Sequence, residues 1–282
     1  MVVQQHGGPV RRAAATAAAL AGVVAGAAGC GGGAEAGDRG GDPAKAVHDA
    51  PDRLIREGSS QARTSMQMAS GGTRVTIRGE GVYDYRDGLG QLRVRLPQDA
   101  AGTQEHRPIT ELLAPGALYM KNRGAGVPAD KWVRVDTAGL NDGNLVTGGA
   151  TDPLAAAELL RGAREVTYVG ESDVAGVPTR HYKGRIDLGV AAKAATAGNQ
   201  KALAAAAKGF GSSPVPFDVY LDDEGLIRKI THRFRFAEKP AGATKKRNVD
   251  VASTTLLFGF GKPAEVRLPD KRDVFAGKVA EQ

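Results

Sequence analysis

Hydrophobic and polar residues alternate strictly in three neighbouring segments, at 63–68, 74–85 and 92–96. Gly71-Gly72 separates the first two segments, and Asp87-Gly88 separates the second from the third. A period of two is typical of half-buried strands, and glycine-containing pairs of this kind are typical of hairpin turns. The pattern predicts an antiparallel meander with one apolar face and one charged face.

Weaker alternation predicts further strands at 109–113, 117–121, 131–135, 165–170, 179–188, 217–221, 226–236 and 249–260, with an edge-like strand at 264–269. Asp42-Pro43 and Asp152-Pro153 each combine a capping residue with a proline suited to the first helical turn, so a helix is expected after each pair. We expect Pro51 to interrupt the first of these helices. The alanine-rich stretch 189–208 predicts another helix, weakened at Gly198-Asn199.

About ten strands with two to three helices indicate an α+β protein dominated by one antiparallel sheet. A sheet of about ten twisted strands tends to curl rather than to stay flat. We therefore expect a strongly curved half-barrel with the helices packed on its concave side. The sequence shows no internal linker after residue 43, so residues 43–282 are expected to form a single domain.

The N-terminal segment has the layout of a bacterial lipoprotein signal peptide. Arg11-Arg12 precedes a short apolar run at 13–28, and small residues then lead to Cys30, the only cysteine in the chain. This order matches the charged, apolar and cleavage regions of a secretory signal. We expect removal of residues 1–29, a diacylglycerol on the Cys30 thiol, and a flexible glycine-rich tether at 30–42. The alternative is an ordinary secretory signal that contains a free cysteine.

Charge and composition argue against several classes of function. The formal net charge is +7, and the densest basic cluster, Lys245-Lys246-Arg247, lies in a stretch bounded by proline and glycine. We interpret this cluster as a solvated loop and expect no nucleic-acid partner. With the Cys30 thiol lipidated, the chain has no cysteine for a disulfide or for catalysis.

Catalytic and metal-binding patterns are also missing from the sequence. His48, His106, His181 and His232 are scattered without the spacing of zinc ligands. We find neither a nucleophile elbow nor a carboxylate pair whose placement can be argued. We therefore expect a protein that is not an enzyme and that holds no metal and no cofactor.

Five motifs occur in an order that resembles a known family. They lie at 131–136 (KWVRVD), 152–154 (DPL), 166–171 (VTYVGE), 174–182 (VAGVPTRHY) and 217–228 (FDVYLDDEGLIR). The succession resembles the LppX/LprAFG-type lipoproteins of actinobacteria, whose fold is similar to that of the LolA and LolB lipoprotein carriers. The resemblance covers roughly residues 45–240.

The resemblance implies a LolA-like half-barrel whose helices and sheet enclose an apolar pocket for acyl chains. Such proteins are implicated in binding lipids or glycolipids and moving them outward from the membrane. Our candidate lining of this cavity comprises Met66, Met68, Val75, Ile77, Val94, Trp132, Phe217, Val219, Ile230, Phe234 and Phe236. The same residues would form a solid core if the helices and the sheet leave no cavity between them.

The expected function is therefore that of a membrane-anchored lipoprotein that carries or presents lipid or glycolipid at the cell envelope. Its expected location is the extracytoplasmic face of the cell membrane, where Cys30 would hold it to the outer leaflet. A lipid or glycolipid ligand and a membrane transporter are the expected partners. The alternative is a scaffold or sensor lipoprotein with a filled core, which binds a protein partner through its loops.

Overall fold

The computed structural model describes residues 41–97, 107–124, 126–147, 151–211, 213–238 and 247–276. Cys30 and the expected signal peptide lie outside the described residues. The strands are β1 (Ser59–Ser70), β2 (Thr73–Asp84), β3 (Leu89–Arg95), β4 (Ile109–Ala114), β5 (Ala117–Lys121), β6 (Trp132–Asp136), β7 (Ala163–Val174), β8 (Val177–Ile186), β9 (Val215–Leu221), β10 (Ile227–Glu238) and β11 (Arg247–Phe258). The helices are α1 (Pro43–Glu57), α2 (Pro153–Glu158), α3 (Leu188–Ala194) and α4 (Ala197–Phe210), with short 3₁₀ turns η1 (Thr137–Gly139), η2 (Leu159–Gly162) and η3 (Lys271–Asp273).

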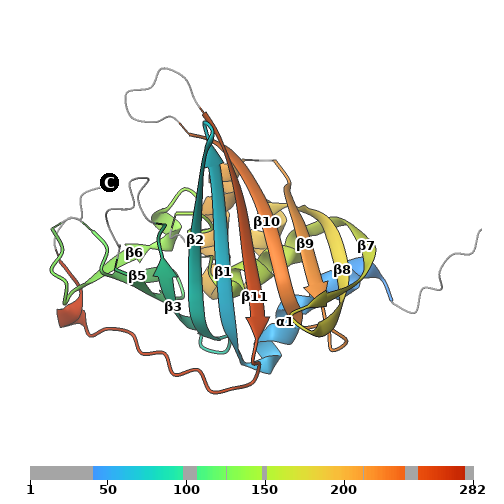
Figure 1. The fold of residues 1–282 in the computed structure, drawn as a ribbon, viewed down its shortest axis with the longest axis horizontal. Helices are drawn as coiled ribbons and strands as arrows, with labels where there is room; N and C mark the ends of the chain where they lie inside the picture. Colours follow the sequence, from blue (N-terminus) through green and yellow to red (C-terminus); the bar gives the residue numbers. More distant parts are fainter. Residues whose placement is uncertain are drawn as a thin grey trace, which may run out of the picture. The chain divides into compact units, whose positions relative to one another are not determined.

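All eleven strands belong to one antiparallel sheet in the order β6-β5-β4-β3-β2-β1-β11-β10-β9-β8-β7 (Figure 1). Neighbouring strands of the sheet are consecutive in the chain everywhere except at the centre, where β1 pairs with β11. The sheet stays open, with β6 and β7 as its edges. The predicted α+β class and the large antiparallel sheet are confirmed, and the described residues form eleven strands instead of about ten and four helices instead of two to three.

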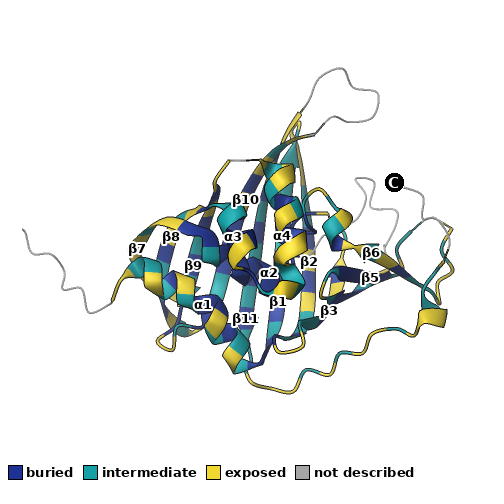
Figure 2. Ribbon diagram, turned by 180° about the vertical axis from the view of Figure 1, so that it is seen from behind, coloured by how far each residue is buried: buried dark blue, intermediate teal, exposed yellow. Residues whose placement is uncertain are grey.

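The register of the central strands gathers the apolar positions on one face of the sheet. Met66 pairs with Ile77 across β1 and β2, and His232 pairs with both Phe217 and Ser253 across β9 to β11. The intervening positions on these strands are largely charged and exposed. All four helices lie on the apolar, concave face, as Figure 2 shows from behind.

Helix α1 begins where the sequence predicts, because the Asp42 side chain accepts a hydrogen bond from the Ala44 amide at 2.9 Å. The expected interruption at Pro51 is wrong, since the helix continues through it to Glu57. Pro51 is buried together with Val47 and Leu54, and this packing outweighs the backbone hydrogen bond that proline removes.

The alanine-rich stretch forms two helices rather than one. The helical conformation is interrupted at Ala195-Thr196, between α3 and α4. Gly198 lies inside the first turn of α4. The buried carboxylate of Glu158 explains the position of the break. It accepts hydrogen bonds from the Thr196 amide at 2.8 Å and from the Asn199 side chain at 2.7 Å.

The prediction of an edge-like strand at 264–269 is wrong. This segment carries no strand, and Leu268 within it is 42% exposed. The tail instead runs on to β6, where Val274 forms a bridge with Trp132 and the Phe275 amide donates to the Trp132 carbonyl at 2.8 Å. Alternation alone predicted a strand at 264–269, but its backbone meets no strand in the part of the chain that the structure describes.

Candidate ligand cleft

Two neighbouring strands, β9 and β10, separate at one end of the sheet. Their pairing ends at His232 and Phe217, whereas β10 continues along β11 as far as Glu238. The register would next place Pro216 opposite Arg233. Because proline has no amide hydrogen to donate, the ladder between β9 and β10 ends there.

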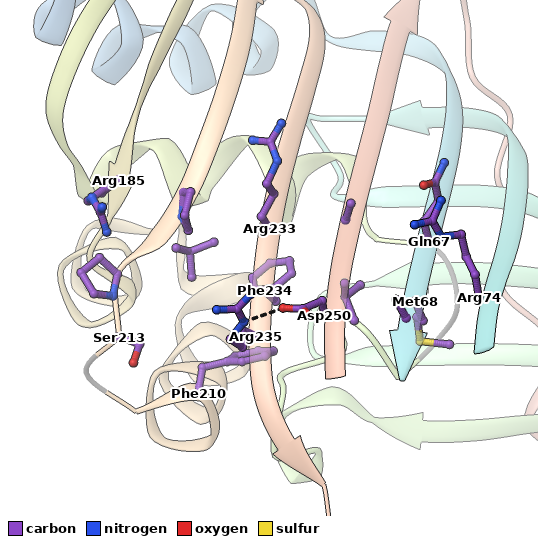
Figure 3. Close-up of a pocket in the computed structure, with 16 residues that line it drawn as sticks. Gln67, Met68, Arg74, Arg185, Phe210, Ser213, Arg233, Phe234, Arg235 and Asp250 are labelled. Carbon is purple, nitrogen blue, oxygen red and sulfur yellow. Dashed lines mark hydrogen bonds and ion pairs between the residues drawn. The ribbon is translucent and has the colours of Figure 1, made fainter. Parts of the chain in front are cut away.

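A cleft of about 730 Å³ occupies this end of the sheet (Figure 3). Such a volume falls within the range of about 300–1,000 Å³ that is typical of sites for small ligands. The lining comes from strands β1, β2, β8, β9, β10 and β11 and from the end of α4. It comprises Gln67, Met68, Ala69, Arg74, Arg185, Phe210, Ser213, Pro214, Val215, Pro216, Arg233, Phe234, Arg235, Asp250, Val251 and Ala252.

The floor of the cleft is apolar and partly aromatic. Phe210, at the end of α4, stacks on Phe234 with ring centroids 5.0 Å apart and meets the edge of Phe236 at 5.7 Å. Phe234 is buried, whereas Phe210 is only half-buried. Val215 and Val251 are buried beside them and also contribute to the lining. This floor belongs to the concave side of the sheet, where the helices pack.

The rim of the cleft is rich in arginine. Arg74, Arg185, Arg233 and Arg235 all belong to the lining. Arg235 forms an ion pair with Asp250, which Figure 3 marks, and Arg185 lies 3.5 Å from a carboxylate oxygen of Glu165. Arg74 has no acidic partner among the residues that the structure describes. The cleft therefore joins an apolar floor to a predominantly cationic rim.

Arg233 belongs to a small charged cluster on the convex face. Its guanidinium pairs with Asp218, whose other carboxylate oxygen lies 2.7 Å from His181 Nε2. Burial acts to raise the pKa of Asp218, but the hydrogen bonds from Arg233 and His181 outweigh it and lower the pKa. The His181 ring also stacks on Tyr220 at 4.3 Å, which agrees with a structural role for this histidine.

A second hollow of about 530 Å³ adjoins the cleft at the connection between α4 and β9. The two hollows share Arg185, Ser213 and Pro214. The second is lined partly by Leu188 and Ala207, from α3 and α4. The open region therefore extends around the end of β8 and offers room for a ligand longer than the cleft alone would hold.

Most of the predicted cavity residues lie deeper in the molecule than this cleft. Six are buried in the core beneath the helices, away from the cleft: Met66, Ile77, Val94, Phe217, Val219 and Ile230; a seventh, Phe234, is also buried but reaches the cleft. Of the eleven predicted residues, only Met68 and Phe234 line the cleft. Val75 and Phe236 are partly buried neighbours of the core, and Trp132 lies far along the sheet on edge strand β6, where its ring faces Lys121 at 5.5 Å.

Sequence reasoning missed Phe210, Val215, Val251 and the arginine rim. Pro214 and Pro216 were a usable signal, since two prolines just before the strand predicted at 217–221 indicate that its pairing fails nearby. The partner strand and the aromatic end of α4 could not be inferred from that signal, because both depend on long-range packing.

Two titratable side chains on the concave face are buried and have side-chain atoms with no hydrogen-bond partner among the described residues. His232 is 1% exposed, and its Nε2 has no hydrogen-bond partner among the described residues; burial lowers its pKa to about 3. Glu111 on β4 is fully buried with neither carboxylate oxygen bonded to a described residue. Burial raises the pKa of Glu111 to about 8, although the charge of Arg123 acts to lower it.

Among the described residues, histidine, aspartate and glutamate side chains form no group of three that could hold a metal ion. No helix in the described part of the chain is both long and apolar enough to cross a membrane.

The fold and the cleft define a class of protein: an open, curved antiparallel sheet, with helices on its concave face and an amphiphilic cleft at one end. No family model and no curated protein matches the chain. Solved structures that are similar include the lipoprotein LppX of Mycobacterium tuberculosis (11% identity, TM-score 0.45, covering 80% of this chain and 98% of that chain).

Two further similar structures are LprF from Mycobacterium bovis and a LolA superfamily protein from Nitrosomonas europaea. LprF is 14% identical with a TM-score of 0.39, covering 81% of this chain and 96% of that chain. The Nitrosomonas protein is 9% identical with a TM-score of 0.33, covering 82% and 96%. The family named by the sequence resemblance is thus present among the similar structures. Every one of these TM-scores is below 0.5.

Proposed function

We propose that the chain is a membrane-anchored lipoprotein that binds the acyl chains of a lipid or glycolipid and carries or presents them at the cell envelope. Residues 1–29 are its signal peptide, Cys30 is its lipid attachment site, residues 30–42 are its tether and residues 43–282 are its ligand-binding domain. It is not an enzyme and uses no cofactor. A membrane transporter is its proposed partner.

The cleft at the separation of β9 and β10 is the observation that supports this proposal. Its apolar floor around Phe210 and Phe234 suits hydrocarbon, and its arginine rim suits an anionic headgroup. Covering apolar surface contributes roughly 25 cal/mol per Å², so an acyl chain would gain most from the floor. Arginine contacts would orient the headgroup at the rim and leave it close to water.

Native mass spectrometry of the chain with Cys30→Ser, purified from a lipid-containing host, tests the proposal. We expect a co-purifying lipid, and we expect rebinding of a fluorescent fatty acid after delipidation. Met68→Arg places a charge in the floor and should weaken fatty-acid binding at least tenfold. Leu268→Arg makes a comparable change on the exposed tail and should leave binding unchanged. Bare protein that also fails to rebind lipid would contradict the proposal.

A filled scaffold or sensor that binds a protein through its loops is the second candidate. It is favoured by the close packing of seven predicted cavity residues in the core beneath the helices. If the chain neither retains nor rebinds lipid, this candidate takes precedence.

A further inference from the structure

A further hollow, separate from the cleft and from the hollow beside it, lies on the opposite face of the sheet from the helices, over β1, β2, β3 and β11. Its volume is about 360 Å³. The four basic residues that line it are Arg63, Arg78, Arg93 and Arg95, and its single acidic residue is Glu80. We call this hollow, with these five residues, the arginine groove.

The register forces like charges together in the arginine groove. Arg78 on β2 pairs directly with Arg95 on β3. The Cβ atoms of directly opposed residues lie about 4.5–5.5 Å apart, and like charges at that distance destabilise a sheet. Folding alone does not favour this pair, so the fold bears a cost that an anion in the groove would relieve.

Glu80 offsets only part of this charge. Its direct neighbours across the sheet are Arg63 on β1 and Arg93 on β3, and its closest ion pair is with Arg95 at 3.9 Å. Elsewhere on the same face arginines have closer acidic partners, as Arg233 has in Asp218. One carboxylate shared among four guanidinium groups leaves the groove with excess positive charge.

The floor of the arginine groove is small and partly polar. Ser65 on β1 pairs with Thr254 on β11, and both side chains line the hollow beside Leu256. Hydroxyl groups can donate to anionic oxygens. The Arg63 guanidinium lies over the ring of Phe258 at 4.8 Å, which helps to hold its position beside this floor.

We propose that the arginine groove is a binding site for a phosphate-bearing group, of the diphosphate or phosphomonoester class. Guanidinium groups match phosphate oxygens bidentately, and several of them converging on one hollow suit an anion with more than one charge. The groove lies on the face that the helices leave uncovered, and it shares no lining residue with the acyl cleft. The phosphate can belong to a soluble molecule or to a lipid headgroup at a bilayer surface.

The test uses the full chain with Cys30→Ser and two probes. Inorganic pyrophosphate is titrated by calorimetry, and co-sedimentation is measured with phosphatidylcholine vesicles with and without phosphatidic acid, whose headgroup is a phosphomonoester. The groove variant is Arg78→Gln/Arg95→Gln. Its matched control is Arg267→Gln/Arg272→Gln, which removes the same charge from the exposed tail. We expect the groove variant to lose about tenfold in affinity for at least one probe, and the control to lose little.

Each outcome decides the proposal or the source of the phosphate. Groove-dependent binding of pyrophosphate alone supports a soluble ligand, and groove-dependent binding of the phosphatidic acid vesicles alone supports a headgroup. Equal losses in both variants, or no binding of either probe, would overturn the site. Arg93→Gln provides a single-residue variant of the groove. Thermal unfolding shows whether each variant folds. Because the double variant removes the repulsion between Arg78 and Arg95, it should be at least as stable as the parent chain. Fatty-acid binding in the cleft should be unchanged, which separates this test from that of the proposed function.

Discussion

The ring of Phe210, the last residue of α4, stacks on Phe234 of β10 with the two centroids 5.0 Å apart. Phe234 lies in the part of β10 that has lost its pairing with β9. The end of α4 therefore covers, from the concave side, the separation between these strands. This contact links the packing of a helix to the openness of the cleft.

Replacing Phe210 with alanine should enlarge the cleft at a modest cost in stability. Aromatic pairs contribute about 0.5–1.5 kcal/mol beyond their buried area, and Phe210 is only half-buried, so we expect a loss of about 2 kcal/mol. Urea unfolding measures the loss, and the fluorescence of an apolar dye should rise. Phe210→Leu is the control, since it keeps an apolar side chain in the lining of the cleft. Equal dye binding by both variants would show that the Phe210 side chain does not limit the space in the cleft.

Glu111 should make the protein less stable as the pH rises. Burial raises its pKa from 4.5 in the unfolded chain to about 8. The neutral carboxyl group therefore makes its full contribution to the free energy of unfolding below pH 4.5. That contribution is lost as the pH rises through 8. At about 1.36 kcal/mol per pKa unit the loss is at most about 5 kcal/mol. Glu111→Gln should flatten the dependence between pH 5 and 8 in urea unfolding and raise stability at pH 8. An unchanged pH profile would rule out this role.

His232 should make the protein less stable as the pH falls below 6.5. Burial lowers its pKa from 6.5 to about 3, so the neutral ring favours the folded state above pH 6.5. This contribution is lost as the pH falls from 6.5 towards 3, again by at most about 5 kcal/mol. His232→Leu, which cannot gain a proton, should be less sensitive to acid in thermal unfolding followed from pH 7 to pH 4. His181→Leu on the convex face is the control. If only this variant lost stability less steeply in acid, His181 rather than His232 would be the histidine that causes the acid sensitivity.

Glu158 should be required for the junction between α3 and α4. Its buried carboxylate accepts hydrogen bonds from the Thr196 amide and the Asn199 side chain. Glu158→Ala leaves these donors unpaired, at a cost of about 2–4 kcal/mol. Denaturant unfolding measures the decrease in the free energy of unfolding. Amide hydrogen exchange in the first turn of α4 should become faster. Glu158→Gln retains one oxygen acceptor and should lose less. Equal losses in the two variants would show that the hydrogen bonds do not set the stability of the junction.

Local patterns were sufficient to predict most of the sheet. Adjacent strands joined by short turns bury one face only, and this arrangement produces the alternation seen around Gly71-Gly72 and Asp87-Gly88. Features that depend on distant residues could not be predicted in this way. The break at Thr196 depends on Glu158, and the path of the tail depends on the contact between Trp132 and Val274.

The candidate site was harder to predict than the fold for the same reason. Alternation identifies which side chains face the core, but it does not show where core packing ends and a cleft begins. Met68 and Phe234 line the cleft, whereas Ile230, on the same face of β10, is buried in the core. The difference arises from Pro216, which lies on another strand and ends the pairing of β9 with β10.

The pairing of β1 with β11 has a consequence for the order of events during synthesis. Strands β1 to β6 can pair in order as they emerge from the ribosome, and strands β7 to β10 can do the same. In the sheet, these two groups of strands are joined only by β11. Until the final strand is made, β1 and β10 each present an unpaired edge that can capture another chain. A chain that stops before residue 247 would therefore hold two separate meanders, and completion of the sheet must await the synthesis of β11.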